Sequence, residues 1–181
     1  MIRDTAVLSI DVQASFEHTP YWRTDDVPGF MAHLRRLLAG AHARQWPVVR
    51  ILHEQADGPF SAASGLLRPL HGLEDGAAVE FRKQAHNAFT STGLDLWLRR
   101  QGIRRLVVAG IRTEQCCETT ARVASDLGYQ VDFVTEATLT FPMRHAGSGR
   151  EYAPEDIKAR TELVLDRRFA RIATVEDALA A

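Results

Sequence analysis

The sequence predicts a three-layer α/β/α protein with a six-stranded, mostly parallel sheet of Rossmann-like topology. Short apolar segments alternate with longer helix-like segments along most of the 181 residues. The apolar segments are nearly continuous, which is typical of strands covered on both faces of a parallel sheet. No repeat, low-complexity tract or linker divides the chain. We therefore expect one domain over residues 1–181.

The six expected strands are apolar runs of four to seven residues. The clearest are AVLSID near the amino end and LVVAGI in the second half of the chain, because both read as continuously buried. PVVRILH is similar, whereas the others are shorter or carry more polar residues. In chain order, the expected strands are residues 6–11, 47–53, 79–82, 106–111, 130–135 and 171–174.

The expected helices lie between these strands. Leu34, Leu37, Leu38 and Ala41 recur at helical spacing in the first of them. Glycines that follow two other segments are typical of helix C-terminal caps. In chain order, the expected helices are residues 30–44, 93–101, 113–127 and 154–169, with a short helix at 66–70 and a final helical turn after 174.

Two long segments, 54–78 and 142–153, have little periodicity. Loops of this length in a compact domain are commonly lids, binding loops or subunit contacts. The net charge of -1 and the pI of about 6.7 give no electrostatic basis for binding nucleic acid or an anionic membrane. The apolar run at residues 6–10 is too short for a leader or a membrane span. We expect a cytoplasmic protein that acts on a small molecule.

Ligands of open α/β sheets bind at the carboxyl ends of the strands. Asp11, His53 and Lys83 lie at three such ends, and Lys83 is one of only two lysines among the 22 basic residues. A turn residue, a hydrogen-bonded structural histidine and a solvated lysine are the respective alternatives. No G-x-G-x-x-G or Walker motif is present, so we expect no cofactor. No H-E-x-x-H motif is present either. His53, Glu54 and Asp57 could supply metal ligands in one loop, but their spacing is unspecific and we expect no metal.

Cys116 and Cys117 are the only cysteines and are adjacent. A disulfide between neighbours closes almost no loop, and two thiols cannot form a four-ligand zinc site. If Thr113 caps the helix that follows, Cys116 lies in its first turn, where the free amides favour a thiolate and lower the thiol pKa. Cys117 shares a small-residue face with Ala121 and is expected in the core. Simple burial of Cys116 is the alternative.

These segments resemble the isochorismatase-like cysteine hydrolases. The run Gly110-Ile-Arg-Thr-Glu-Gln-Cys-Cys-Glu-Thr-Thr-Ala-Arg is similar to the family's nucleophile segment. Leu8-Ser-Ile-Asp-Val-Gln-x-x-Phe16 and Lys83-Gln-Ala-His-Asn-Ala-Phe-Thr-Ser-Thr92 are similar to its first-strand and lysine segments. The resemblance extends from about residue 7 to residue 178 and is weakest in 54–78 and 142–153.

The resemblance implies a catalytic triad in which Cys116 is the nucleophile, Asp11 its general base and Lys83 the third member. It also implies a cis peptide bond between Ile111 and Arg112, with the backbone amides of Arg112 and Cys116 forming an oxyanion hole. Members of the family are commonly oligomers, so a homo-oligomer is expected. The Asp-x-His metal ligands of the family's nicotinamidases are missing after the second strand.

The resulting hypothesis is a metal-independent cysteine hydrolase that cleaves a C–N bond in a small amide, carbamoyl or ureido compound through a thioester. Phe16, Trp22 and His53 are candidates for the pocket wall because they follow the first two strands. One alternative is a thiol redox or sensor protein that uses Cys116 and Cys117. Another is a catalytically silent α/β binding module. The identity of the substrate cannot be read from the sequence.

Overall fold

The computed structural model describes residues 4–73 and 75–180 and contains a six-stranded sheet with the order β3-β2-β1-β4-β5-β8. Every neighbouring pair in this sheet is parallel, which confirms the predicted fold class. The central strands β1 and β4 are the two segments with the most continuous apolar sequence. The strands are β1 Thr5–Ile10, β2 Val48–His53, β3 Val79–Lys83, β4 Arg105–Ile111, β5 Gln130–Leu139 and β8 Arg171–Ile172.

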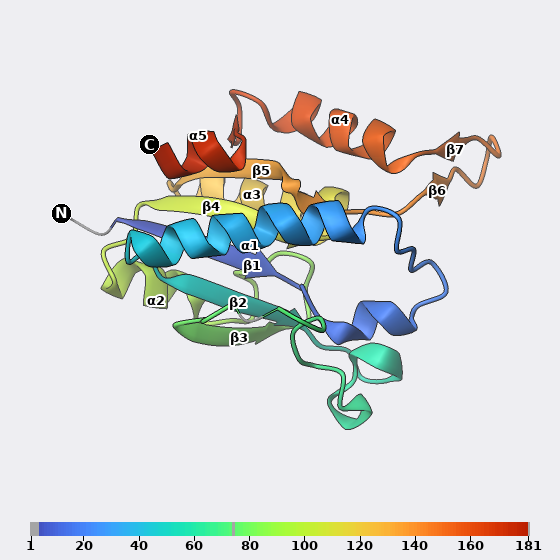
Figure 1. Cartoon of the computed structure of the whole chain (residues 1–181), viewed down its shortest axis with the longest axis horizontal. Coiled ribbons are helices and arrows are strands. Elements are labelled where there is room, and N and C mark those ends of the chain that lie inside the picture. Colours follow the sequence, from blue (N-terminus) through green and yellow to red (C-terminus); the bar gives the residue numbers. More distant parts are fainter. Residues whose placement is uncertain (1–3, 74, 181) are drawn as a thin grey trace.

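Helices cover both faces of the sheet and give the expected three layers (Figure 1). Side chains alternate between the faces of a strand. Val107, for example, joins the core under α1 (Val27–Ala43) and α5 (Val175–Ala180). Val108 joins the opposite core with α2 (Leu94–Arg100) and α3 (Glu118–Asp126). The helix α4 (Pro154–Leu165) adds Leu165 to this second core.

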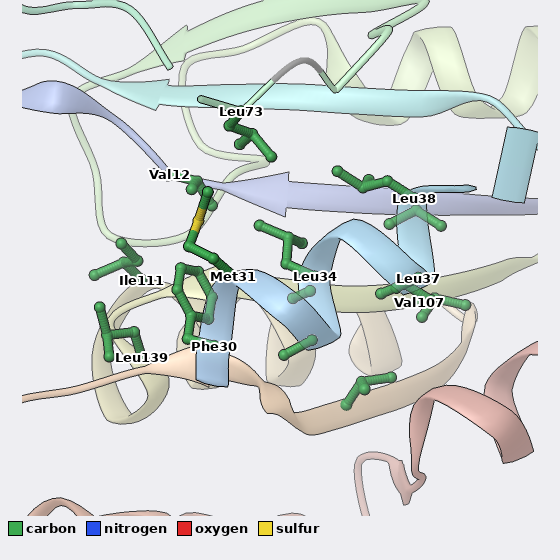
Figure 2. Packing of buried hydrophobic residues seen from close by; sticks show 14 of the residues in the cluster. Val12, Phe30, Met31, Leu34, Leu37, Leu38, Leu73, Val107, Ile111 and Leu139 are labelled. Atoms are coloured by element: carbon green, nitrogen blue, oxygen red, sulfur yellow. The ribbon is translucent and has the colours of Figure 1, made fainter. Parts of the chain in front are cut away.

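The amphipathic pattern of the first helix fits its packing on the sheet. Figure 2 shows Leu34, Leu37 and Leu38 of α1 facing the strands, with Val107 beneath them. Near the carboxyl edge of the sheet, Phe30 and Met31 of α1 lie beside Val12, Ile111 and Leu139. This apolar core anchors the edge at which the strand ends meet.

Three expectations about irregular segments need correction. No helix forms at 66–70, where Pro69 instead forms a bridge with Gln13 and the Arg68 carbonyl accepts from Ala14. The segment 142–153 contains a short antiparallel pair, β6 (Met143–Arg144) and β7 (Glu151–Tyr152). The helix expected at 113–127 begins with a π-helical turn, η4, over Thr113–Cys117. Single 3-10 turns are η1 Ala14–His18, η2 Gly58–Phe60 and η3 Ala62–Ser64.

Among the described residues, no helix is both long enough and apolar enough to cross a membrane.

Candidate active site

Strand register brings the predicted site residues to one edge of the sheet. Ile10 pairs with Gly110 across β1 and β4, and His53 pairs with Lys83 across β2 and β3. Asp11 follows β1 directly with a left-handed φ of 52°. Gly110 has a φ of 135°, and a Cβ atom there would lie 2.0 Å from the carbonyl oxygen of Ile10. Glycine therefore allows β4 to approach the end of β1 at this point.

The Lys83 ammonium lies at the centre of the site. Its Nζ is 2.8 Å from Asp11 Oδ2, 3.3 Å from Cys116 Sγ and 3.1 Å from His53 Nδ1. The side chains of Lys83 and Asp11 are 0% and 1% exposed. Four residues that are distant in sequence therefore form one buried cluster. These distances argue against a silent module in which the three polar groups would lie far apart.

Cys116 and Cys117 have different surroundings, as their sequence positions indicated. Cys116 is 7% exposed and contacts Lys83, whereas Cys117 is 0% exposed and joins the core with Ala121. Thr113 was expected to cap the helix with its side chain, and this was wrong. Its hydroxyl donates instead to Thr138 Oγ1, because Thr113 is fully buried against β5. The peptide bond between Ile111 and Arg112 is cis.

The expectation that the Cys116 thiol has a lowered pKa is also wrong for the resting site. Burial raises its pKa, and the negative charge of Asp11 raises it further. Lys83 acts in the opposite direction but does not outweigh these two effects. The position of Cys116 at a helix start did not show that the Asp11 carboxyl group lies beside it. In the resting protein, position 116 therefore holds a thiol and not a thiolate.

Asp11 is placed to take up a proton. Burial raises the pKa of its carboxyl group above the ordinary range, although Lys83 opposes this effect. Oδ2 accepts from Lys83, whereas Oδ1 is buried and has no hydrogen-bond partner among the described residues. Burial lowers the pKa of Lys83, but the attraction of the Asp11 carboxyl group opposes burial, and the pKa is raised overall. The site thus combines an ammonium, a neutral thiol and a carboxyl group whose Oδ1 has no hydrogen-bond partner among the described residues.

Asp11, His53 and Cys116 offer possible metal-ligand atoms that lie within 4.8 Å of one another. The Lys83 ammonium donates a hydrogen bond to each of these three residues and therefore lies among the atoms that would bind the metal ion. A metal ion bound there would meet a positive charge at very short range, in a buried setting where such repulsion is poorly screened. Asp11, His53 and Cys116 therefore do not fit a metal ion beside the Lys83 ammonium.

The three residues proposed for the pocket wall belong to one aromatic cluster beside the site. The rings of His53 and Phe16 both meet Phe60, with centroid distances of 5.9 Å and 5.0 Å. The ring of Trp22 lies 5.4 Å from that of Phe141. Sequence reasoning missed Phe60 and Phe141. Phe141 follows the end of β5 by two residues, so the rule about strand ends was a signal for it.

Gln13 is a third residue to which sequence reasoning assigned no role. Its Oε1 accepts from the backbone N–H of His53 at 2.7 Å, and its Nε2 donates to the carbonyl of His53 at 3.0 Å. The side chain is fully buried. Gln13 therefore fixes the end of β2 against the segment that follows Asp11. Its position within the first-strand motif, Leu8 to Phe16, could have indicated that this residue has a role.

The side chain of Arg112 is held away from water by two kinds of contact. Its guanidinium lies over the rings of Tyr21 and Phe141, 5.1 Å and 5.7 Å from their centroids. Its Nη2 is 3.0 Å from Glu114 Oε1, and both side chains are 11% exposed. Glu114 in turn accepts from Thr140 at 2.6 Å. These contacts fix the backbone of the residue that was expected to contribute to an oxyanion hole.

The fold and the site define an α/β protein with a cysteine, a lysine and an aspartate in contact at the carboxyl edge of a parallel sheet. Residues 5–176 match the family model described as the Isochorismatase domain. The chain therefore belongs to the isochorismatase family, which confirms the resemblance stated from the sequence motifs.

Relatives of several kinds are similar to this chain. The uncharacterized isochorismatase family protein YwoC of Bacillus subtilis is 39% identical over 118 residues, covering 61% of this chain and 62% of that protein. Nicotinamidase 3 of Arabidopsis thaliana is 37% identical, with 43% and 39% covered. A ureidoacrylate amidohydrolase, RutB of Agrobacterium fabrum, is 34% identical, with 52% and 37% covered. This chain thus matches less than two thirds of the length of each of these three relatives.

Solved structures extend the likeness to the whole fold. An isochorismatase-family protein from Chromobacterium violaceum superimposes with a TM-score of 0.85 at 27% identity, covering 98% of this chain and 92% of that one. A cysteine hydrolase from Pseudomonas syringae pv. phaseolicola gives a TM-score of 0.87 at 21% identity, with 98% and 91% covered. The second likeness shows the fold alone.

Proposed function

We propose that this protein is a metal-independent cysteine hydrolase that cleaves a C–N bond in a small amide, carbamoyl or ureido compound. The observation that carries the proposal is the position of the Lys83 ammonium between Asp11 Oδ2 and Cys116 Sγ. A nucleophile with a base and a cation beside it is the arrangement that covalent acyl transfer requires. Relatives named as a nicotinamidase and a ureidoacrylate amidohydrolase support the same reaction class.

The first half of the reaction forms a thioester. Because burial and Asp11 raise the pKa of Cys116, the thiol keeps its proton until a substrate carbonyl is in place. Asp11 Oδ1 then takes the proton as Sγ attacks the carbonyl carbon, and Lys83 stabilises the developing thiolate. The backbone amides of Arg112 and Cys116 donate to the oxyanion. The C–N bond breaks, and Asp11 returns the proton to the leaving nitrogen.

The second half releases the acyl group. A water molecule attacks the thioester carbonyl while Asp11 takes one of its protons. The C–S bond breaks, the acid leaves and the proton returns from Asp11 to Cys116 Sγ. One water is consumed for each C–N bond cleaved. The ammonium of Lys83 stays protonated throughout, in keeping with its raised pKa.

Substitution of the two neighbouring cysteines tests this proposal. We expect Cys116→Ala and Cys116→Ser to abolish hydrolysis in a screen of small amides, carbamates and ureido compounds, and to abolish the acyl-enzyme adduct detected by mass spectrometry. Cys117→Ala is the matched control and keeps both, because its side chain is fully buried in the core. Equal labelling of both thiols by an alkylating reagent, without any acyl adduct, would contradict the proposal.

The redox alternative has weaker support. Cys117 is fully buried, and burial raises the pKa of its thiol well above the ordinary value. A buried neutral thiol exchanges poorly with an external disulfide. A redox function would also leave the buried Asp11 and Lys83 side chains without a role in the chemistry. Loss of two hydrogens on mild oxidation, without hydrolysis of any amide, would favour this alternative.

A further inference from the structure

The ammonium of Lys83 has three N–H donors, and three acceptors from different elements surround it. Asp11 follows β1, His53 ends β2 and Cys116 lies in η4. The distances from Nζ are 2.8 Å, 3.1 Å and 3.3 Å, respectively. The side chain of Lys83 is fully buried, so water does not replace a missing acceptor easily. Each of the three contacts therefore contributes to the direction in which the ammonium points.

The imidazole of His53 is a neutral acceptor. Burial lowers its pKa to about 4, and the positive charge of Lys83 acts in the same direction. At neutral pH the ring carries one proton, and the contact from Lys83 places the lone pair on Nδ1 and the proton on Nε2. Nε2 lies 3.4 Å from the side-chain amide of Gln55. The amide nitrogen of Gln55 makes this contact; with the amide rotated by 180°, its oxygen would accept the Nε2 proton.

The backbone of His53 is fixed as firmly as its ring. Gln13 bonds to both the N–H and the carbonyl of this residue. The parallel register of β2 and β3 places His53 beside Lys83. The Phe60 ring also packs against the imidazole in a T-shaped arrangement, with the two planes at 77°. A contact held from three sides in this way has a defined direction and is more than a chance proximity.

We propose that His53 is a positioning residue, which holds the Lys83 ammonium between Asp11 and Cys116 by accepting one of its N–H groups at Nδ1. The inference rests on the proposed function and assigns it a fourth residue. A neutral acceptor satisfies the ammonium without adding a negative charge near Cys116. A carboxylate in the same place would compete with the forming thiolate for Lys83 and would raise the thiol pKa further.

The other charged or titratable groups near Lys83 do not take over this role. Asp11 and Cys116 carry out the proposed chemistry themselves. His86, in the loop after β3, is exposed, and its ring centroid is 6.3 Å from that of His53. Within the described residues, no hydrogen bond joins His86 to the ammonium. His53 is therefore the group whose removal isolates the third contact.

Three substitutions at position 53 separate the acceptor from the bulk of the ring. His53→Asn places an oxygen where Nδ1 lies, His53→Gln places one near Nε2, and His53→Leu removes the acceptor. His18→Leu is the control, because His18 is exposed and lies outside the cluster. Circular dichroism and urea unfolding first establish that each variant is folded. The two polar variants keep the test valid if the leucine variant does not fold.

The readout that needs no substrate is the pH profile of Cys116 alkylation by iodoacetamide, followed by peptide mass spectrometry. We expect His53→Leu and His53→Gln to slow alkylation about tenfold at each pH tested, because the thiol is mostly protonated below its raised pKa and a misplaced ammonium stabilises the thiolate less. His53→Asn and His18→Leu should stay within about threefold of the wild-type rate. Cys117 provides the unreactive reference in each digest.

The second readout is hydrolysis of an amide found in the screen. The same two variants should lose about 10- to 100-fold in kcat/KM, mainly through kcat, and His53→Asn should recover most of this loss. The inference is overturned if His53→Leu and His53→Gln match the wild type in both readouts, or if His53→Asn is as impaired as they are. A wild-type Cys116 that reacts no faster than Cys117 and forms no acyl adduct would instead overturn the proposed function.

Discussion

The buried ion pair between Lys83 and Asp11 allows a quantitative test of the site. Lys83→Met keeps most of the apolar side chain and removes the ammonium. The two side chains are 2.8 Å apart and 0% and 1% exposed, so the carboxylate left behind cannot turn to water. Removing one partner of a buried pair costs about 3–5 kcal/mol. We expect a loss of about 3 kcal/mol or more in the free energy of unfolding at pH 7.

The pH dependence of this loss has a definite sign. Without the ammonium, burial alone acts on Asp11, and its folded-state pKa lies above the unfolded value of about 3.9. A carboxyl group with a raised folded-state pKa favours the folded state when it is protonated. The penalty of Lys83→Met is therefore largest at neutral pH and shrinks as the pH falls towards 4. Urea unfolding at pH 7 and pH 4.5, followed by tryptophan fluorescence, measures both values.

A double-mutant cycle completes the test. Asp11→Asn together with Lys83→Met removes both charges, so most of the lost stability should return, with a coupling energy of about 2 kcal/mol or more. Activity should not return, because both groups take part in the proposed reaction. A loss below about 1 kcal/mol for Lys83→Met, or additive effects of the two substitutions, would show that water reaches the pair and would refute the reasoning.

Two further predictions concern stability. His53 has a folded-state pKa of about 4, so between pH 6.5 and pH 4 the unfolded chain binds a proton that the folded chain does not. The free energy of unfolding should decrease by about 3 kcal/mol at most as the pH falls across this window, and His53→Asn should flatten this decrease in urea titrations. Gly110→Ala should cost about 3 kcal/mol or more, because its Cβ would lie 2.0 Å from the Ile10 carbonyl oxygen. Gly29→Ala, in α1 with open space around it, should instead add about 0.5–1 kcal/mol in the same unfolding assay; a loss for Gly29→Ala, or no loss for Gly110→Ala, would contradict this reasoning.

The sequence predicted the architecture because the sheet is built from local patterns. Continuous apolar runs mark strands that are buried on both faces, and all six lie in the parallel sheet. The irregular segments were predicted less accurately than the sheet. Helix 66–70 does not form, since bonds to the segment after β1 replace those of a helix there. The segment 142–153 pairs with itself as β6 and β7, which composition did not reveal.

The candidate site was predictable in its members but not in its electrostatics. Strand ends and motif resemblance selected Asp11, Lys83 and Cys116, and the structure brings these three into contact. The predicted sign of the pKa shift at Cys116 was wrong, because burial and the charge of Asp11 raise this pKa more than Lys83 lowers it. Their catalytic roles stay predictions until the cysteine variants are assayed.

The sequence by itself determined how strands and helices follow one another along the chain. It also determined which side chains supply the chemical groups of the site and the family to which the chain belongs. These follow from periodicity and motif, which are local properties of the chain. Only the tertiary structure decided which acceptors share the Lys83 ammonium and how deeply they are buried. Burial and short distances between residues as far apart as 11 and 116 depend on packing, and these set the charge of each group. That is why His53 changed from a candidate for the pocket wall to a positioning residue.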